Sequence, residues 1–181
     1  MKTRTFLTPI LLFGCALAVA GCGKSQEERQ VEQVAFDQDK TVLPSCSFDA
    51  VMRIRVPDVS SRDTEQICEA MVTTLRRNPS VRLLRELSKA VTTLTPGGTT
   101  EEQILQARHF MRIAKARGQL KSDDAMISTF NVVFKIVTSM RERITMAELA
   151  EFTEQMGVEA ESMSDEGLIH SAAAISAFKG R

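Results

Sequence analysis

The stretch SDDAMISTFNVVFKIVTSM, from Ser122 to Met140, is the most apolar of the segments that read as helices. Its apolar residues recur at intervals of three and four, which is the period of one face of an α-helix. Ser122 or Asp123 can cap its first turn. We expect this helix to be the central one of the fold. Its apolar face consists of Met126, Ile127, Phe130, Val133, Phe134, Val137 and Met140.

Five other segments on either side carry the same periodicity, separated by turn signals such as Pro96-Gly97-Gly98. Thr100 with Gln103, and Thr145 with Glu148, have the spacing of capping boxes. Six helices joined by short turns predict an all-α fold, a single helical bundle. The five segments run from Ser60 or Ser61 to about Arg77, from Asn78-Pro79 to Leu94, from Thr100 to Arg117, from Thr145 to Gly157 and from Ser164 to about Phe178.

An irregular segment with Pro44 and Pro57 precedes the helices, over residues 41–59. Within it, Met52 to Val56 alternates apolar and basic residues. This alternation predicts a short half-buried strand, or an extended segment packed on the helices. We therefore expect one helical domain over residues 41–181, with an extended N-terminal segment.

The beginning of the chain has a different character. Lys2 and Arg4 are followed by an almost wholly apolar run from Phe6 to Ala20. The run is shorter than the roughly 18 to 20 residues of a membrane-spanning helix. A basic start, a short apolar core and small residues at the exit are typical of a secretory signal peptide. The exit reads Val19-Ala20-Gly21-Cys22.

This exit resembles the lipobox of bacterial lipoproteins. The resemblance implies that residues 1–21 are a signal peptide, that cleavage occurs before Cys22, and that Cys22 carries the lipid anchor. Gly23, where aspartate favours retention at the inner membrane, implies the outer membrane, with the domain facing the periplasm. Acyl chains on Cys22 bury methylene groups at about 0.8 kcal/mol each, enough to hold the protein on the membrane. Residues 22–40 are polar and indicate a tether. The alternative is an ordinary signal peptide with an incidental cysteine.

Two cysteines follow Cys22 in the chain, Cys46 and Cys68. Exported proteins fold in an oxidising compartment, where an even pair of cysteines most simply forms a disulfide. We therefore predict a Cys46–Cys68 disulfide that pins the irregular segment to the first helix. Two separate free thiols are the alternative.

The composition argues against several classes of function. The chain has no Trp and no Tyr, which are the usual stacking platforms for sugars and nucleic-acid bases. His109 and His170 are the only histidines, and neither has a neighbour at metal-ligand spacing. No nucleophile elbow or phosphate-binding loop is present in the sequence. We therefore predict a protein that is not an enzyme, with no catalytic residue, metal, cofactor or nucleic-acid partner.

Charge is segregated along the chain. Arg76 to Lys121 holds ten basic and three acidic residues, whereas Ser122 to His170 holds three basic and ten acidic ones. Surfaces of one sign attract partners of the other. A basic partner would bind the acidic stretch; the alternative is that the two segments face each other and cancel. The candidate partner-binding residues are Glu148, Glu151, Glu154, Glu159 and Glu161, of which the first three recur at every third position and are expected to share about one helix face.

These observations predict a non-enzymatic lipoprotein, anchored in the outer membrane, that binds another protein of the cell envelope. Small helical pilotins of secretion systems are similar in plan, with a lipid anchor, a disulfide and a domain that grips a client helix. An accessory role in secretion or pilus assembly is therefore one interpretation. A protective lipoprotein that blocks a toxin, a phage or a conjugating donor is the alternative. The identity of the partner and the oligomeric state stay open.

Overall fold

The computed structural model describes residues 25, 39–54, 56 and 59–181. The expected signal peptide, Cys22 and nearly all of the tether lie outside these residues. Within the described part the chain is all-α, as the sequence predicts, and the backbone bridge between Val42 and Ser80 belongs to no strand. The helices are α2 (Phe48–Met52), α3 (Ser61–Leu75), α4 (Val81–Leu94), α5 (Thr100–Ala116), α6 (Asp123–Ser139), α7 (Met146–Gln155), α8 (Val158–Glu161) and α9 (Asp165–Lys179).

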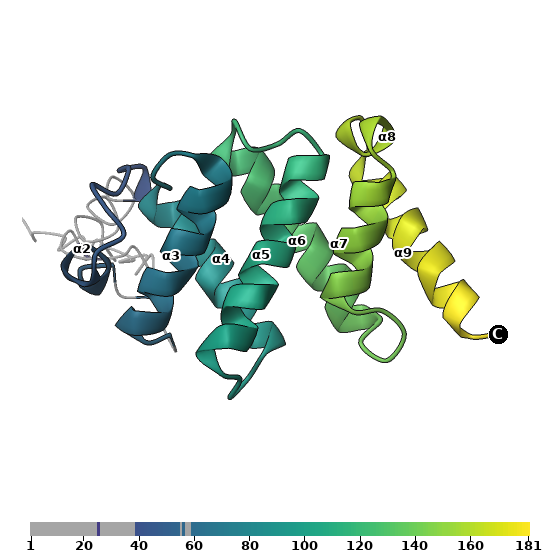
Figure 1. The fold of residues 1–181 in the computed structure, drawn as a ribbon, viewed down its shortest axis with the longest axis horizontal. Coiled ribbons are helices and arrows are strands. Elements are labelled where there is room, and N and C mark those ends of the chain that lie inside the picture. The colour runs from purple at the N-terminus through teal and green to yellow at the C-terminus, as the bar shows by residue number, and fades with distance from the viewer. Residues whose placement is uncertain (1–24, 26–38, 55, 57–58) are drawn as a thin grey trace, which may run out of the picture.

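The long helices are stacked in two layers along the long axis of the molecule (Figure 1). Helices α3, α5 and α7 pack side by side in one layer, and α4 packs beside α6 in the other. The last helix, α9, contacts both α7 and α6 and lies at the C-terminal end of the array. Among the described helices, therefore, the outer sides of α7 and α9 are not covered by a further layer.

The apolar content of the sequence favours α6 as the central helix, and this prediction is wrong. Helix α5 is central, because its main contacts are with α3, α4, α6, α7 and α8, whereas those of α6 are with α4, α5 and α9. The buried face of α5 includes the polar residues Gln103 and His109, which dilute its apolar signal. Helix α6 instead leaves Ser128, Asn131 and Lys135 exposed on one side.

Each of the six long helices begins after a Ser or Thr whose side chain accepts a hydrogen bond from the backbone N–H three residues on. Such a cap stabilises a helix by about 1 kcal/mol. Because Ser80 is the cap of α4, Pro79 lies before that cap and not in the first turn of the helix. The capping residues are Ser60, Ser80, Thr99, Ser122, Thr145 and Ser164.

One of the two predicted capping boxes is confirmed and the other is wrong by one position. Thr145 forms the predicted box with Glu148 at the start of α7. At α5 the box begins at Thr99 rather than Thr100, with a glutamate three residues on. Thr100 instead donates a hydrogen bond to the carboxylate of Asp63 on α3, at 2.6 Å. A Thr-Thr pair offers two possible caps, and here a tertiary contact occupies the second.

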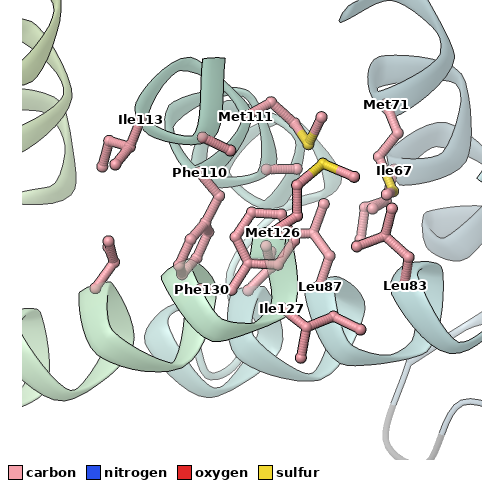
Figure 2. Close-up of a cluster of buried hydrophobic side chains, with 14 of the residues drawn as sticks. Ile67, Met71, Leu83, Leu87, Phe110, Met111, Ile113, Met126, Ile127 and Phe130 are labelled. Carbon is pink, nitrogen blue, oxygen red and sulfur yellow. The ribbon is translucent and has the colours of Figure 1, made fainter. Parts of the chain in front are cut away.

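A continuous hydrophobic core joins the two layers (Figure 2). The rings of Phe110 on α5 and Phe130 on α6 meet edge to face, with centroids 5.3 Å apart and planes at 70°. Such an aromatic pair contributes about 0.5–1.5 kcal/mol beyond the burial of its area. The fully buried side chains of this cluster include Ile67, Met71, Leu83, Leu87, Phe110, Met111, Ile113, Met126 and Phe130.

The N-terminal segment differs from the predicted strand. Residues 48–52 form the short helix α2, and Met52 ends it with an exposed side chain. Ile54 and Val56 are buried but Met52 is not, so the alternating pattern reports burial at two of its three apolar positions. The backbone nearby pairs with a helix start rather than a strand, because Leu43 N–H donates to the carbonyl of Pro79 at 3.0 Å. The segment is thus held to the bundle without a partner strand among the described residues.

The structure joins Cys46 to Cys68 by a disulfide, as the sequence predicts. Their Cα atoms are 5.6 Å apart, within the ordinary range for a bridged pair. Cys68 lies on the buried face of α3. The bridge therefore fixes the irregular segment to the first helix of the array.

Candidate functional site

The basic and acidic segments of the sequence lie against each other in the fold. Internal cancellation, one of the two alternatives that the sequence leaves open, therefore accounts for part of the charge segregation. In the described part of the chain, four ion pairs join the two segments: Arg77–Asp123 at 2.5 Å, Arg82–Asp124 at 2.7 Å, Arg112–Glu154 at 2.5 Å and Arg117–Asp165 at 2.8 Å.

Glu148, Glu151 and Glu154 do not share one face of α7. A helix turns about 100° per residue, so each step of three residues drifts by about 60°. Glu154 therefore turns toward α5, where it pairs with Arg112. This hydrogen bond is the main reason why the pKa of Glu154 lies below its ordinary value. Glu148 and Glu151 remain together on the outer side of the helix.

The two candidate glutamates of α8 lie apart from that outer surface. Glu161 packs against Gly118, since a Cβ placed on that glycine would lie 2.8 Å from Glu161 Cγ. Gly118 has a φ of +65°, which closes the turn after α5. Glu159 is exposed on α8. The structure thus brings together two of the five candidate residues.

A groove of about 550 Å³ lies between α7 and α9, at the C-terminal end of the array. Its apolar lining comes from Phe152 of α7 and from Ile175 and Phe178 of α9. Glu148 and Glu151 supply its acidic groups. The groove is open to water, because Phe178 is 82% exposed. We call this surface the α7/α9 groove; its lining residues are Glu148, Glu151, Phe152, Gln155, Ala174, Ile175 and Phe178.

The groove exists because α9 is apolar on more than one side. One face of α9 packs against α6 and α7 with Leu168 and Ala172 buried. Phe178 and Ile169 are both exposed on the two opposite flanks of that face, and only Phe178 lies on the flank that lines the groove. A helix that is apolar all round is normally buried. Part of the apolar surface of α9 is therefore left uncovered by the described residues.

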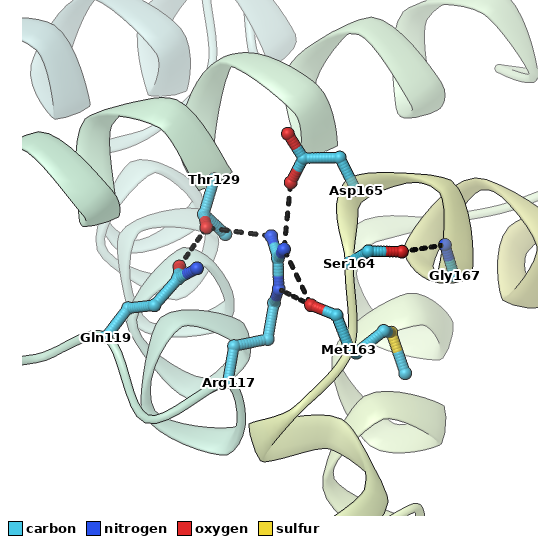
Figure 3. Close-up of polar contacts among 7 residues, drawn as sticks. All are labelled: Arg117, Gln119, Thr129, Met163, Ser164, Asp165 and Gly167. Atoms are coloured by element: carbon cyan, nitrogen blue, oxygen red, sulfur yellow. Dashed lines mark hydrogen bonds and ion pairs between the residues drawn. The ribbon is translucent and has the colours of Figure 1, made fainter.

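Arg117 fixes the start of α9 against the bundle (Figure 3). It follows the last turn of α5, and its side chain is 3% exposed. Its guanidinium donates to the Thr129 hydroxyl of α6 at 2.9 Å, to the Met163 carbonyl at 2.9 and 3.3 Å, and to the Asp165 carboxylate at 2.8 Å. Met163 and Asp165 flank Ser164, the cap of α9. One buried arginine thus ties α5 and α6 to the helix that forms one wall of the groove.

Glu148 is held at the groove by a residue of α9. Lys179 Nζ pairs with Glu148 Oε1. The other oxygen, Oε2, accepts from the Thr145 backbone N–H at 2.9 Å and from its hydroxyl at 2.8 Å. The Lys179 contact is the largest cause that lowers the pKa of Glu148, so this carboxylate is charged at neutral pH. Glu151 makes no ion pair with the described residues and accepts a hydrogen bond from Gln155 at 3.2 Å.

The two histidines lie on different helices. Burial lowers the pKa of His109, and the charge of Arg112 lowers it further against the opposing charge of Glu154. His109 Nδ1 has no hydrogen-bond partner in the described part of the chain. His170 is exposed on α9. Over residues 39–54, 56 and 59–181, no three His, Cys, Asp or Glu side chains gather as a metal site would require.

Sequence reasoning missed the apolar half of the site and the buried arginine. Phe152, Ile175 and Phe178 give the same signal whether they line a core or a binding surface. The signal that finds them is the low amphipathicity of residues 165–179, where apolar and small residues occur on both sides of the helix. Arg117 gives no sequence signal, because its burial depends on acceptors far along the chain.

Comparison of this chain with protein-family models, with curated proteins and with solved structures finds no match. Among the described helices, none is long and apolar enough to cross a membrane.

Proposed function

We propose that this chain is a lipid-anchored, non-enzymatic protein of the bacterial outer membrane that binds another envelope protein through the α7/α9 groove. The observation that carries the proposal is the groove itself, an apolar surface open to water with two glutamates beside it. Large exposed apolar surfaces bordered by polar residues commonly mark interaction sites. The groove therefore supports the proposal that a protein partner binds at this end of the molecule.

The anchor and the groove are compatible with each other. A lipid on Cys22 would be joined to the bundle by the polar residues 22–40. The described chain enters the bundle at the α2 end, whereas α7 and α9, whose residues line the groove, lie at the far end of the array (Figure 1). An anchor at Cys22 therefore leaves the groove accessible to a partner in the periplasm.

Site-specific photo-crosslinking in intact cells tests this proposal. A photoreactive phenylalanine analogue at Phe178 reports contacts in the groove, and the same analogue at Ile169 is the matched control, because Ile169 is exposed on α9 and does not line the groove. We expect one adduct with an envelope protein from position 178 and none from position 169. Mass spectrometry of the adduct then tells an assembly or secretion component from a toxin, phage or conjugation protein.

Two results would count against the proposal. Equal adducts from both positions would show non-specific capture at an exposed helix. No adduct at position 178, in cells where the variant is correctly processed, would leave the groove without a partner. A true client adduct should also be lost when Glu151 is changed to Lys, since that change reverses a charge at the groove on an exposed side chain whose hydrogen bond is to the neighbouring Gln155.

A further inference from the structure

We infer that the occupant of the α7/α9 groove is a basic amphipathic helix. We further infer that Lys179 forms an ion pair with Glu148 in the free protein, and that a basic side chain of the bound helix replaces Lys179 in this ion pair. The inference rests on the proposed function and specifies its partner. It joins three features of the described residues: the shape of the groove, its charge, and the ion pair that spans it.

The shape of the groove suits a helix. The lining residues of α7 are Glu148, Glu151, Phe152 and Gln155, which is a spacing of three, four and seven. That line covers two helical turns, or about 10 Å. A partner helix lying along α7 would place its own apolar residues, at the same spacings, over Phe152, Ile175 and Phe178. The exposed aromatic ring of Phe178 offers the largest apolar contact area of the lining.

The charge of the groove selects a basic helix. Its lining holds two glutamates and no lysine, arginine or histidine. Glu151 is exposed and has no ion pair within the described part of the chain. Glu154, the next acid along α7, pairs with Arg112 of α5 and does not line the groove. A client with basic residues beside its apolar stripe would therefore be complementary at Glu148 and Glu151.

Lys179 already provides one such basic contact. It lies in the last turn of α9 and reaches across to Glu148 on α7, so its ion pair joins the two helices that form the groove. The side chains are 43% and 34% exposed. Ion pairs as exposed as this one are weak and exchange readily. A lysine or arginine of the client can thus displace Lys179 from Glu148, while the capping contacts of Glu148 with Thr145 stay in place.

The exchange makes an unusual prediction about sign. Removing Lys179 takes away a competitor, so a basic helix should bind more tightly to Lys179→Gln than to the wild type. The gain should be about two- to fivefold, the effect of one exposed ion pair. Arg181→Gln is the matched control. Arg181 lies two residues after Lys179, its side chain is exposed and makes no ion pair with Glu148, and the substitution removes the same charge. It should change the affinity little.

The probe is a fluorescein-labelled peptide of 18 residues with a leucine stripe flanked by lysines, and a second peptide with glutamines in place of the lysines. Anisotropy titrations use the full mature chain, residues 22–181, with Cys22→Ser so that no lipid is attached. We expect the lysine peptide to bind at least twofold more tightly than the glutamine peptide at low salt. We expect that difference to shrink as salt is added.

A double-variant cycle separates exchange from general charge attraction. Glu148→Gln keeps the capping box, since glutamine serves at that position. It removes the negative charge for which Lys179 and a lysine of the peptide compete. In the Glu148→Gln background, Lys179→Gln should leave the affinity unchanged. If Lys179→Gln still tightens binding there, Lys179 acts as a distant charge and the exchange is refuted. Equal affinity for both peptides, or no binding of either, would overturn the basic-helix assignment.

A second copy of this chain is the competing occupant. Sedimentation velocity of the full mature chain decides it: a dimer that Phe178→Ser dissociates would assign the groove to self-association and overturn the inference. Failure here is distinguishable from failure of the proposed function. A client cross-linked at position 178 whose binding ignores Glu148 and Lys179 would leave the proposed function standing and remove only the basic-helix inference.

Discussion

Replacing Arg117 by methionine removes the guanidinium that ties α5, α6 and the start of α9 together, while keeping an unbranched apolar stem. The charged group makes hydrogen bonds to the Thr129 hydroxyl, to the Met163 carbonyl and to the Asp165 carboxylate. The Arg117 side chain is 3% exposed, so water cannot replace the contacts with Thr129 and Met163 without opening the structure. The Met163 carbonyl would then lose both hydrogen bonds that it accepts from the Arg117 guanidinium.

The expected cost follows from these contacts. Losing the guanidinium leaves the Thr129 hydroxyl and the Met163 carbonyl without this donor, and two buried polar groups left in that way cost about 2–6 kcal/mol. Asp165 is 49% exposed and recovers water when Arg117 is lost, which places the expected loss near the lower end, at about 3 kcal/mol. For a domain of this size, that corresponds to a fall in Tm of roughly 6–12 °C. Arg117→Lys keeps the charge but not the planar fork of donors, so it should lose an intermediate amount.

Urea unfolding followed by circular dichroism at 222 nm measures the loss, because the chain has no Trp or Tyr for intrinsic fluorescence. Arg82→Met is the matched control, since Arg82 pairs with Asp124 in a contact that is 48% and 82% exposed. An exposed pair of this kind contributes about 1 kcal/mol or less. If Arg117→Met and Arg82→Met lose equal amounts of stability, the reasoning about the buried network is refuted.

Three further predictions concern the anchor, the disulfide and the pH dependence. Cys22→Ser should yield an uncleaved or soluble protein in membrane fractionation, and a cleaved, membrane-bound product would contradict the lipid anchor. Replacing Cys46 and Cys68 together by serine should lower the free energy of unfolding by about 3 kcal/mol, in the chain-entropy model for a separation of 22 residues. Non-reducing peptide mapping of the wild type that finds two free thiols would contradict the disulfide. Because Arg112 lowers the pKa of Glu154, this pair stabilises the fold above the unfolded pKa of about 4.3 and is lost as pH falls through the lower folded pKa. The stability difference between wild type and Glu154→Gln, about 1 kcal/mol or less at pH 7, should therefore vanish in acid, and a difference that persists at pH 3 would refute this assignment.

The sequence predicts the long helices well because their ends carry local chemistry. A Ser or Thr cap and a Gly or Pro stop act within one turn of the chain, so Ser122 and Ser164 mark the starts of α6 and α9 without knowledge of the tertiary fold. The error at Thr99 and Thr100 has a local origin as well, since either threonine is a suitable cap. Only the contact of Thr100 with Asp63 distinguishes them.

The centre of the fold could not be predicted in the same way. Helix α5 is central although it buries Gln103, His109 and the adjacent Arg117. Apolar periodicity ranks such a helix below α6, because a polar side chain counts as a surface residue until its partners are known. Arg117 finds Met163 and Asp165 more than 40 positions later in the chain.

For a related reason, the sequence predicts the acidic part of the candidate site but not its apolar part. The acidic character of α7 is a local property, and it led to Glu148 and Glu151. Which acids are neutralised is a tertiary property, as the pairing of Glu154 with Arg112 shows. The apolar part of the groove depends on Phe178 being exposed, and periodicity alone cannot separate an exposed apolar face from a buried one.

A chemical-shift titration of the full mature chain with the lysine-bearing peptide tests the central claim most directly. If the α7/α9 groove is the binding site, the backbone amides of residues 148–155 and 174–179 should shift together with one saturation curve. Amides beside the separate cavity between α4 and α6, at Asn131 and Phe134, should stay in place. Shifts centred on that cavity, or no saturable shift in α7 and α9, would contradict the assignment of the groove as the partner-binding site.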